Sequence, residues 1–320
     1  MEREMNASPD LDLAVAAPPS KSKQKPSKHE SGESRRPEFD WNKIRSSPGF
    51  VPGVALAIGV LAAFWSLLSS LPAIWFADDG YYSHGILVPF ISLYVVYRWW
   101  PNLSKIPVKP AVYSLVLLVP LLYFIVRPAE VNRVDQLTSV CLILCVLLSV
   151  AFIAGWRWMF ALSLPTLYLA FALPIWNMAI TYYTNPLQLL STKVAYHMLE
   201  WVGKEPFSRG DNFIYLGSGF QLDVGVPCSG LKLVLALYAF TFFFAMIARL
   251  RWWANVILIG VIPLPLALFI NGLRIALIGI VGDTWGNDAG HTFHDWSGYI
   301  TLIVCFFILF RIARWLGLKD

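Results

Sequence analysis

Residues 228–250, CSGLKLVLALYAFTFFFAMIARL, decide the fold class. Between Lys232 and Arg249 this stretch contains no charged residue. A helix needs about 20 predominantly apolar residues to cross the hydrocarbon layer of a membrane. The stretch therefore predicts a transmembrane helix, which we place at residues 228–247.

The composition of the whole chain also indicates a lipid environment. The 320 residues are 57% hydrophobic and 14% charged, whereas about a quarter of a soluble domain is charged. Seven further apolar runs resemble the first one: residues 51–75, 84–100, 111–127, 134–154, 158–175, 253–280 and 295–315. We therefore predict an all-α, polytopic transmembrane helical bundle with about eight transmembrane helices.

Two segments differ from these runs. Residues 1–49 are rich in Ser, Pro, Lys and Glu and contain too little apolar area to fold alone, which predicts a disordered basic tail before one transmembrane domain at residues 50–320. The residues near Met1 contain no short apolar run, so we expect no cleaved signal peptide there. Residues 176–227 combine a weakly amphipathic part with NFIYLGSGFQLDV, residues 212–224, which favours a hairpin.

Lys and Arg counts in the loops predict the orientation, because cytoplasmic loops are enriched in both. With the N-terminus inside, 18 of the 25 Lys and Arg residues lie on the cytoplasmic side and five on the other side. We expect a multi-pass protein of the cell inner membrane with both termini cytoplasmic and residues 176–227 outside. The net charge of +5 is too unevenly spread for a nucleic-acid-binding face, so we expect membrane lipid and no nucleic acid as partner.

This topology brings three reactive side chains to a similar depth near the outer surface. Cys228 begins the sixth span, Arg274 lies about 9 Å below the outer end of the seventh, and His294 stands at the outer start of the eighth. The three spans are consecutive. A thiol, a guanidinium and an imidazole are therefore expected to meet.

Cys228 is the candidate nucleophile. Pro227 and Ser229 favour a helix start, where the unpaired N–H groups and the positive end of the helix dipole stabilise a thiolate. Lys232, four residues on, lies on the same face and adds a positive charge. The alternative is a small apolar residue that packs between helices. That alternative is our prediction for the remaining cysteines, Cys141, Cys145 and Cys305.

Arg274 and His294 are the candidate partners of the thiol. An arginine within an apolar run is functional, snorkels to the interface or forms a structural ion pair, and Asn271 can hydrogen-bond on its face. Arg274 remains protonated, so it would stabilise an oxyanion or orient a carbonyl rather than act as a base. His294 suits proton transfer near neutral pH, although an interfacial histidine bonded to water is the alternative.

The other histidines leave further options open. His291 is three residues before His294, so either ring could carry the proton, and the pair could hold a metal with Asp288 or Asp295. No convincing third ligand follows from the sequence, so we expect neither metal nor cofactor. His84 is expected at the outer face, in the same cavity as the three reactive groups.

Four sequence blocks, in order, resemble the exosortase/archaeosortase family. They are YYSHGILVPFISLYVVYRW at 81–99, VPCSGLKLV at 226–234, NGLRIALIGI at 271–280 and FHDWSGYI at 293–300. This chain has Val226–Pro227 where many members have Glu-Ala, and Lys232 where many have Arg.

The resemblance implies a membrane cysteine protease or transpeptidase. Its members are thought to cleave exported proteins at a C-terminal sorting signal, which comprises a short Pro-Glu-Pro motif, one transmembrane helix and a basic end (PEP-CTERM). The catalytic residues that it implies here are Cys228, Arg274 and His294, and we add Lys232, Ser229, Asn271 and His84 as supporting residues. The alternatives are a transporter or channel component that binds an anionic solute, and a non-catalytic membrane scaffold.

Overall fold

The computed structural model describes residues 45–46, 50–77, 80–126, 135–208, 210–217, 219–248 and 251–317. The chain divides into two compact units, Met1–Glu38 and Phe39–Asp320, and every described residue belongs to the second. The predicted disordered tail, residues 1–49, thus lies outside the described residues except at positions 45 and 46.

Each of the eight predicted apolar runs contains a helix. The first five give α2 (Phe50–Ala63), α3 (Trp65–Trp75), α4 (Leu87–Leu103), η1 (Val112–Ser114), α5 (Leu115–Val126), α6 (Asp135–Ala154) and α7 (Trp156–Tyr168). Two short turns, η3 (Leu169–Phe171) and η4 (Pro174–Trp176), lead into α8 (Asn177–Trp201). The last three runs give α9 (Leu231–Ala248), then α10 (Trp252–Asn255), η6 (Val256–Val261) and α11 (Pro263–Trp285), and finally α12 (Asn287–Trp315).

The number of membrane crossings is smaller than predicted when length and composition are the criteria. Among the described residues, four helices are long and apolar enough: Asp135–Ala154, Leu231–Ala248, Trp252–Trp285 and Asn287–Trp315. Two bent pairs raise the number to six if each pair is one span, with a bend of 62° at α2–α3 and of 67° between Trp156–Phe171 and Pro174–Trp201. The all-α membrane bundle is confirmed, but the count of about eight is not.

The predicted hairpin is present. Strand β1 (Phe213–Tyr215) pairs antiparallel with β2 (Gln221–Asp223), with Ile214 opposite Leu222. Because alternate side chains of a strand point to opposite faces, these two residues share one face, and both are buried. They pack in a cluster with Cys228 and Ile275, so the hairpin covers the end of the bundle that holds the thiol.

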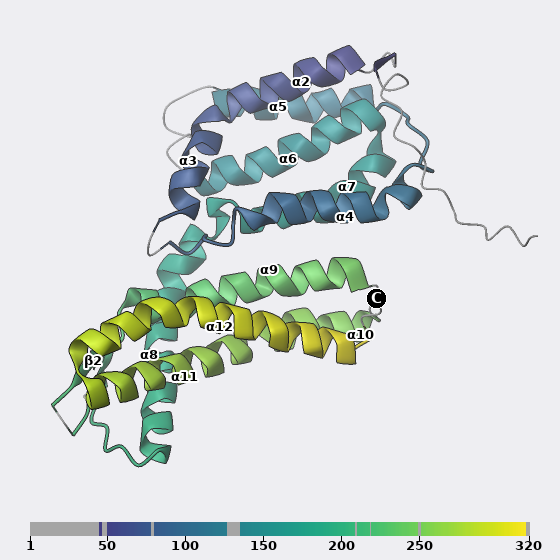
Figure 1. The fold of residues 1–320 in the computed structure, drawn as a ribbon. Coiled ribbons are helices and arrows are strands. Elements are labelled where there is room, and N and C mark those ends of the chain that lie inside the picture. Colours follow the sequence, from purple (N-terminus) through teal and green to yellow (C-terminus); the bar gives the residue numbers. More distant parts are fainter. Residues whose placement is uncertain are drawn as a thin grey trace, which may run out of the picture. The chain divides into compact units, whose positions relative to one another are not determined.

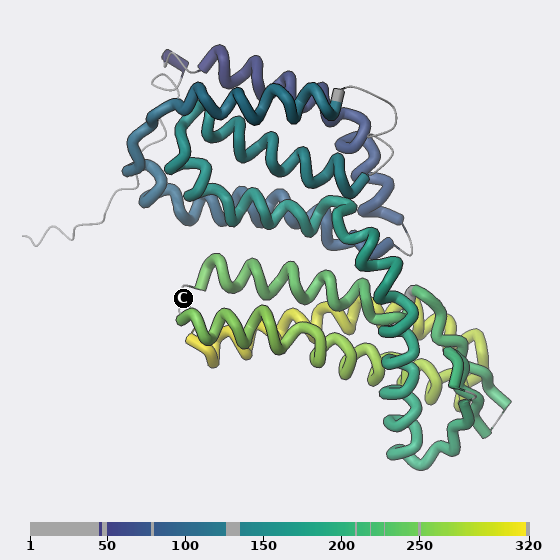
Figure 2. Tube along the Cα trace, turned by 180° about the vertical axis from the view of Figure 1, so that it is seen from behind, coloured from purple at the N-terminus to yellow at the C-terminus, as the bar shows by residue number. Residues whose placement is uncertain are grey.

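Helix α8 runs crosswise to α9, α11 and α12 (Figures 1 and 2). The sequence predicts an amphipathic segment here, and the structure gives a helix of 25 residues with Pro186 inside it. Its buried residues include Ser191, Ala195 and Leu199. In Figure 1 the hairpin, the start of α9 and the turn between α11 and α12 gather at one end of the bundle, opposite the end of α12.

Small residues let α11 approach its neighbours closely. A Cβ atom at Gly272 would lie 2.4 Å from Cγ1 of Val194 on α8, and one at Gly290 on α12 would lie 3.2 Å from Cα of Gly282. Small residues at helix interfaces are typical of membrane proteins, where dispersion contacts between backbones replace the hydrophobic effect. Helix α11 therefore packs tightly against both α8 and α12.

Gly272→Ala is expected to destabilise the protein by about 1–3 kcal/mol, because the β-branched Val194 cannot yield without moving α8. Thermal unfolding of the purified protein in detergent measures the change. Gly59→Ala in α2 is the matched control, since a Cβ there meets nothing within 4 Å. Equal melting temperatures for the two variants would contradict the close packing of α8 on α11.

Candidate active site

The thiol lies in the turn that leads into α9. The short turn η5 (Val226–Cys228) ends at Cys228, whose N–H donates to the carbonyl of Gly225 at 2.9 Å. The residue is 5% exposed. Cys228 is therefore covered by protein and stands three residues before the first residue of α9, close to where the sequence places it.

Gly230 and Asn271 fix this turn. Gly230 adopts a φ of +81°, and a Cβ atom there would lie 2.9 Å from Nδ2 of Asn271. Nδ2 of Asn271 donates to the carbonyl oxygen of Cys228 at 2.8 Å. Only glycine combines this backbone conformation with so close a neighbour. The predicted support from Asn271 thus takes the form of a bond to the backbone of the cysteine.

The imidazole of His294 reaches the thiol directly. Sγ of Cys228 lies 2.9 Å from Nε2 of His294, although 66 residues separate the two in the sequence. This distance allows a hydrogen bond and a proton transfer between sulfur and nitrogen. His294 belongs to α12 and its side chain is 32% exposed. One edge of the base is therefore open to solvent while the sulfur is covered.

A carboxylate stands at the other ring nitrogen of His294. Nδ1 lies 3.3 Å from Oδ1 of Asp295, whose side chain is 79% exposed. The sequence suggests Asp295 only as a possible metal ligand. In the structure, the imidazole of His294 instead lies between the thiol of Cys228 and the carboxylate of Asp295.

Arg274 contacts the backbone that carries His294. Its Nε donates to Oγ of Ser297 at 2.9 Å, and its Nη2 donates to the carbonyl of His294 at 3.1 Å. Ser297 Oγ donates to the same carbonyl at 3.0 Å. No motif in the sequence predicts this role of Ser297, although a residue three positions after His294 shares its helix face. The three reactive side chains are thus brought together. Arg274 joins the group through the α12 backbone, where it binds the carbonyl of His294.

The remaining supporting residues occupy two places. Oγ of the buried Ser229 accepts from the N–H of Leu231 at 3.4 Å, and its carbonyl accepts from Oγ of Ser191 on α8 at 3.3 Å. Ser191 carries no motif signal in the sequence, so its contact could not be foreseen.

His84 lies in the turn before α4 and is 6% exposed. The positive charge of Lys232 on α9 acts on His84. The two supporting residues are therefore close enough to interact electrostatically. Within the part of the chain that the structure describes, neither nitrogen of the buried imidazole has a hydrogen-bond partner of ordinary geometry.

The structure does not place the other histidines at the thiol. His291 is exposed, and Nδ1 of His197 on α8 lies 3.3 Å from Glu200. Within the described part of the chain, no group of three or more His, Cys, Asp or Glu side chains could hold a metal ion. The contact with Cys228 distinguishes His294 from His291 as the proton carrier that the geometry favours.

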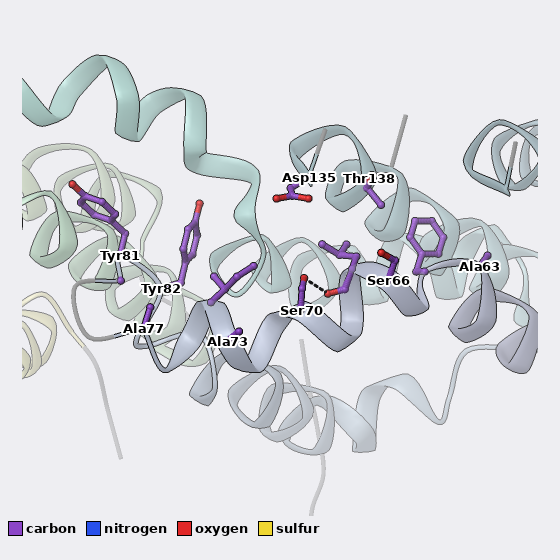
Figure 3. A pocket seen from close by; sticks show the side chains of 13 residues that line it. Ala63, Ser66, Ser70, Ala73, Ala77, Tyr81, Tyr82, Asp135 and Thr138 are labelled. Atoms are coloured by element: carbon purple, nitrogen blue, oxygen red, sulfur yellow. Dashed lines mark hydrogen bonds between the residues drawn. The ribbon is translucent and has the colours of Figure 1, made fainter. Parts of the chain in front are cut away.

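A separate cavity lies away from these residues. It has a volume of about 570 Å³ and is bounded by α3, the start of α6 and the turn that contains Tyr81 and Tyr82 (Figure 3). Ser66, Ser70 and Asp135 give it polar atoms, but Cys228, Arg274, His294 and His84 do not line it. The expectation that His84 shares a cavity with the reactive groups is therefore not supported by this cavity.

A second depression is formed by α11 and α12. It measures about 600 Å³ and lies between the end of α11 and the first turns of α12, with Trp285, Phe293 and Trp296 in its wall. Phe293 directly precedes His294 and packs against the cluster that contains Cys228. His294 itself does not line this depression.

These features define a class: a multi-pass membrane protein with a cysteine–histidine pair at the ends of its apolar helices. Residues 75–311 match the family model described as transmembrane exosortase. The chain belongs to this family, which confirms the resemblance seen in the four sequence blocks. No match was found among curated proteins or among solved structures.

Gly230→Ala is expected to displace the turn of Cys228, because alanine is strained at this φ by about 1–2 kcal/mol and its Cβ meets Asn271. The rate at which iodoacetamide alkylates Cys228 near neutral pH should change several-fold, as read by mass spectrometry. Gly217→Ala, at a position where a Cβ meets nothing within 4 Å, serves as the control. An unchanged rate in Gly230→Ala would show that the turn does not need glycine.

Proposed function

We propose that this exosortase-family protein is a membrane-embedded cysteine peptidase or transpeptidase. It cleaves exported proteins at a C-terminal sorting signal of the PEP-CTERM type, at the outer face of the inner membrane. The observation that carries the proposal is the 2.9 Å contact between Sγ of Cys228 and Nε2 of His294 in a chain of this family. A nucleophile within hydrogen-bond reach of a base, which a third group orients, is the arrangement that covalent catalysis requires.

The first half of the reaction forms an acyl-enzyme. Nε2 of His294 takes the proton of the Cys228 thiol, and the thiolate attacks the carbonyl carbon of the scissile peptide bond. The resulting tetrahedral intermediate carries a negative charge on oxygen. Its collapse breaks the C–N bond, and His294 gives its proton to the leaving amine, which departs with the membrane tail of the signal.

The second half releases the product. Water or an acceptor amine attacks the thioester, and His294 removes a proton from this second nucleophile. Cys228 then leaves as a thiolate and recovers its proton. Hydrolysis and transpeptidation thus use the same residues and differ only in the acceptor.

Arg274 has two tasks in this proposal. A guanidinium has five N–H donors, of which Nε and Nη2 already hold α12. Its other donors stabilise the oxyanion, assisted by the N–H groups at the start of α9. The charge of Arg274 thereby acts on the transition state while its contacts hold His294 in place.

The membrane topology follows from the charge pattern. We propose eight crossings, with α2–α3 and the apolar helices α4, α5 and α7 counted as spans, both termini in the cytoplasm and the hairpin on the outer side. Residues 1–49 form a separate basic tail before the transmembrane domain at residues 50–320. The bound substrate then has its own transmembrane helix among the spans and its scissile bond beside Cys228.

Cys228→Ala is expected to leave a reporter substrate uncut, because the variant lacks the thiol that contacts His294 and would form the thioester. The reporter is an exported protein that ends in a Pro-Glu-Pro motif, one transmembrane helix and a basic end. Immunoblotting of cell membranes separates precursor from product. Cys141→Ala, another buried cysteine but one on α6, should process the reporter normally.

Normal processing by Cys228→Ala would refute the nucleophile assignment. If processing also continued when His294 and Arg274 were changed to alanine, the chain would have to act as a transporter component or scaffold. Both of those alternatives predict no special role for the thiol.

Arg274→Lys is expected to lower the cleavage rate by roughly 10- to 100-fold, although the positive charge is retained. Lysine lacks the planar fork that holds Ser297 and the His294 carbonyl together. The initial rate of reporter cleavage in isolated membranes measures the loss, and the exposed Arg311→Lys on the same helix α12 is the control. Full activity of Arg274→Lys would mean that charge alone is required.

A further inference from the structure

The order of hydrogen-bonding groups around His294 determines which ring nitrogen carries the proton. A carboxylate without a proton only accepts hydrogen bonds. The 3.3 Å contact between Nδ1 of His294 and Oδ1 of Asp295 therefore requires the hydrogen on Nδ1. In a neutral imidazole the other nitrogen, Nε2, then bears the lone pair, and Nε2 is the atom that faces Sγ of Cys228.

We infer that Asp295 is a positioning residue that holds His294 in the tautomer able to take the proton of Cys228. The inference rests on the proposed function and extends it from a cysteine–histidine pair to a cysteine–histidine–aspartate row. The proton moves from Sγ to Nε2 and no further. Nδ1 keeps its own hydrogen, which stays bonded to Asp295, and the carboxylate is not protonated at any step.

The surroundings of the ring leave this task to Asp295. The titratable or charged groups with contacts to His294 in the described chain are Cys228 from η5, Arg274 from α11 and Asp295 from α12 itself. Arg274 binds the carbonyl of His294 and offers the ring no acceptor. Lys232 on α9 is a cation whose charge acts on His84. Of these groups, only Asp295 can accept a hydrogen bond from Nδ1.

The exposure of Asp295 limits how much its substitution should change the reactivity of Cys228. Asp295 is 79% exposed, so water and salt screen its charge. The loss on substitution should therefore be much smaller than for the buried aspartate of a serine protease. The thiolate–imidazolium state is nevertheless favoured by a carboxylate at Nδ1, since both ring N–H groups then have acceptors.

The experiment measures the thiolate fraction of Cys228 without any substrate. The full-length protein in membranes is alkylated with iodoacetamide at about pH 6 and about pH 9.5, and the ratio of the two rates is taken for Cys228 by mass spectrometry. The alkaline rate is an internal reference, because the thiol ionises there without help from His294. Labelling of the buried Cys141, Cys145 and Cys305 reports any unfolded protein.

Asp295→Asn is expected to lower this ratio about tenfold, because an amide can donate to Nδ1 and so stabilise the wrong tautomer. Asp295→Glu, which keeps the carboxylate, should recover a substantial part of the ratio. Reporter cleavage by Asp295→Asn should fall through its turnover rate rather than through substrate affinity. Glu200→Gln is the matched control, because Glu200 is also an exposed carboxylate 3.3 Å from Nδ1 of a histidine, His197.

Three results would overturn the inference: an unchanged ratio in Asp295→Asn, an equal fall in Glu200→Gln, or no recovery in Asp295→Glu with the protein folded. The proposed function fails by a different result, namely reporter cleavage by Cys228→Ala. An unchanged ratio in Asp295→Asn together with a dead Cys228→Ala variant would remove Asp295 from the mechanism and leave the nucleophile in place.

Discussion

One turn of α11 sets the distance between the thiol and the imidazole. Asn271 and Arg274 are three residues apart and so lie on the same side of this helix. Asn271 holds the carbonyl of Cys228 and Arg274 holds the carbonyl of His294. Two segments that are 66 residues apart in the chain are thus tied to a single rigid element. The reactive atoms need no loop closure to meet, because the helix between them serves as the common support.

The polar groups that build this arrangement are buried, so the loss of one of their hydrogen bonds has a high cost in free energy. Asn271 is 2% exposed, Ser297 4% and Ser229 1%. An unpaired carbonyl in such a setting costs several kcal/mol, since neither water nor lipid can replace the missing donor. Gly230 breaks the helical hydrogen-bond ladder just after Cys228, so the carbonyls there need side-chain donors, and Asn271 and Ser191 supply them. The same bonds that satisfy the backbone therefore fix the position of Cys228.

The sequence predicts the elements of this site better than their contacts. Hydropathy and loop charge place Cys228, Arg274 and His294 near the ends of neighbouring apolar helices, and the glycine-rich segment at 212–224 forms the expected hairpin. The roles of Asp295, Ser297 and Ser191 could not be predicted, because the direction of a side chain depends on how the helices pack. The span count differs for a related reason. Hydropathy detects apolar runs, whereas the bend between α2 and α3 and the break before α8 depend on local backbone geometry.

In the proposed reaction, the uneven exposure of Cys228 and His294 bears on the choice between hydrolysis and transfer. The sulfur is covered, at 5% exposure of its residue, whereas the ring of His294 and the carboxylate of Asp295 face outward. In that reaction, a substrate carbonyl has to reach Cys228 past the residues that cover it, and an acceptor would reach the thioester from the exposed side of His294. Water is always present on that side. An amine competes with it only if something holds the amine there. Selectivity for transfer would thus depend on binding the acceptor beside His294 rather than on the reactivity of the thiol.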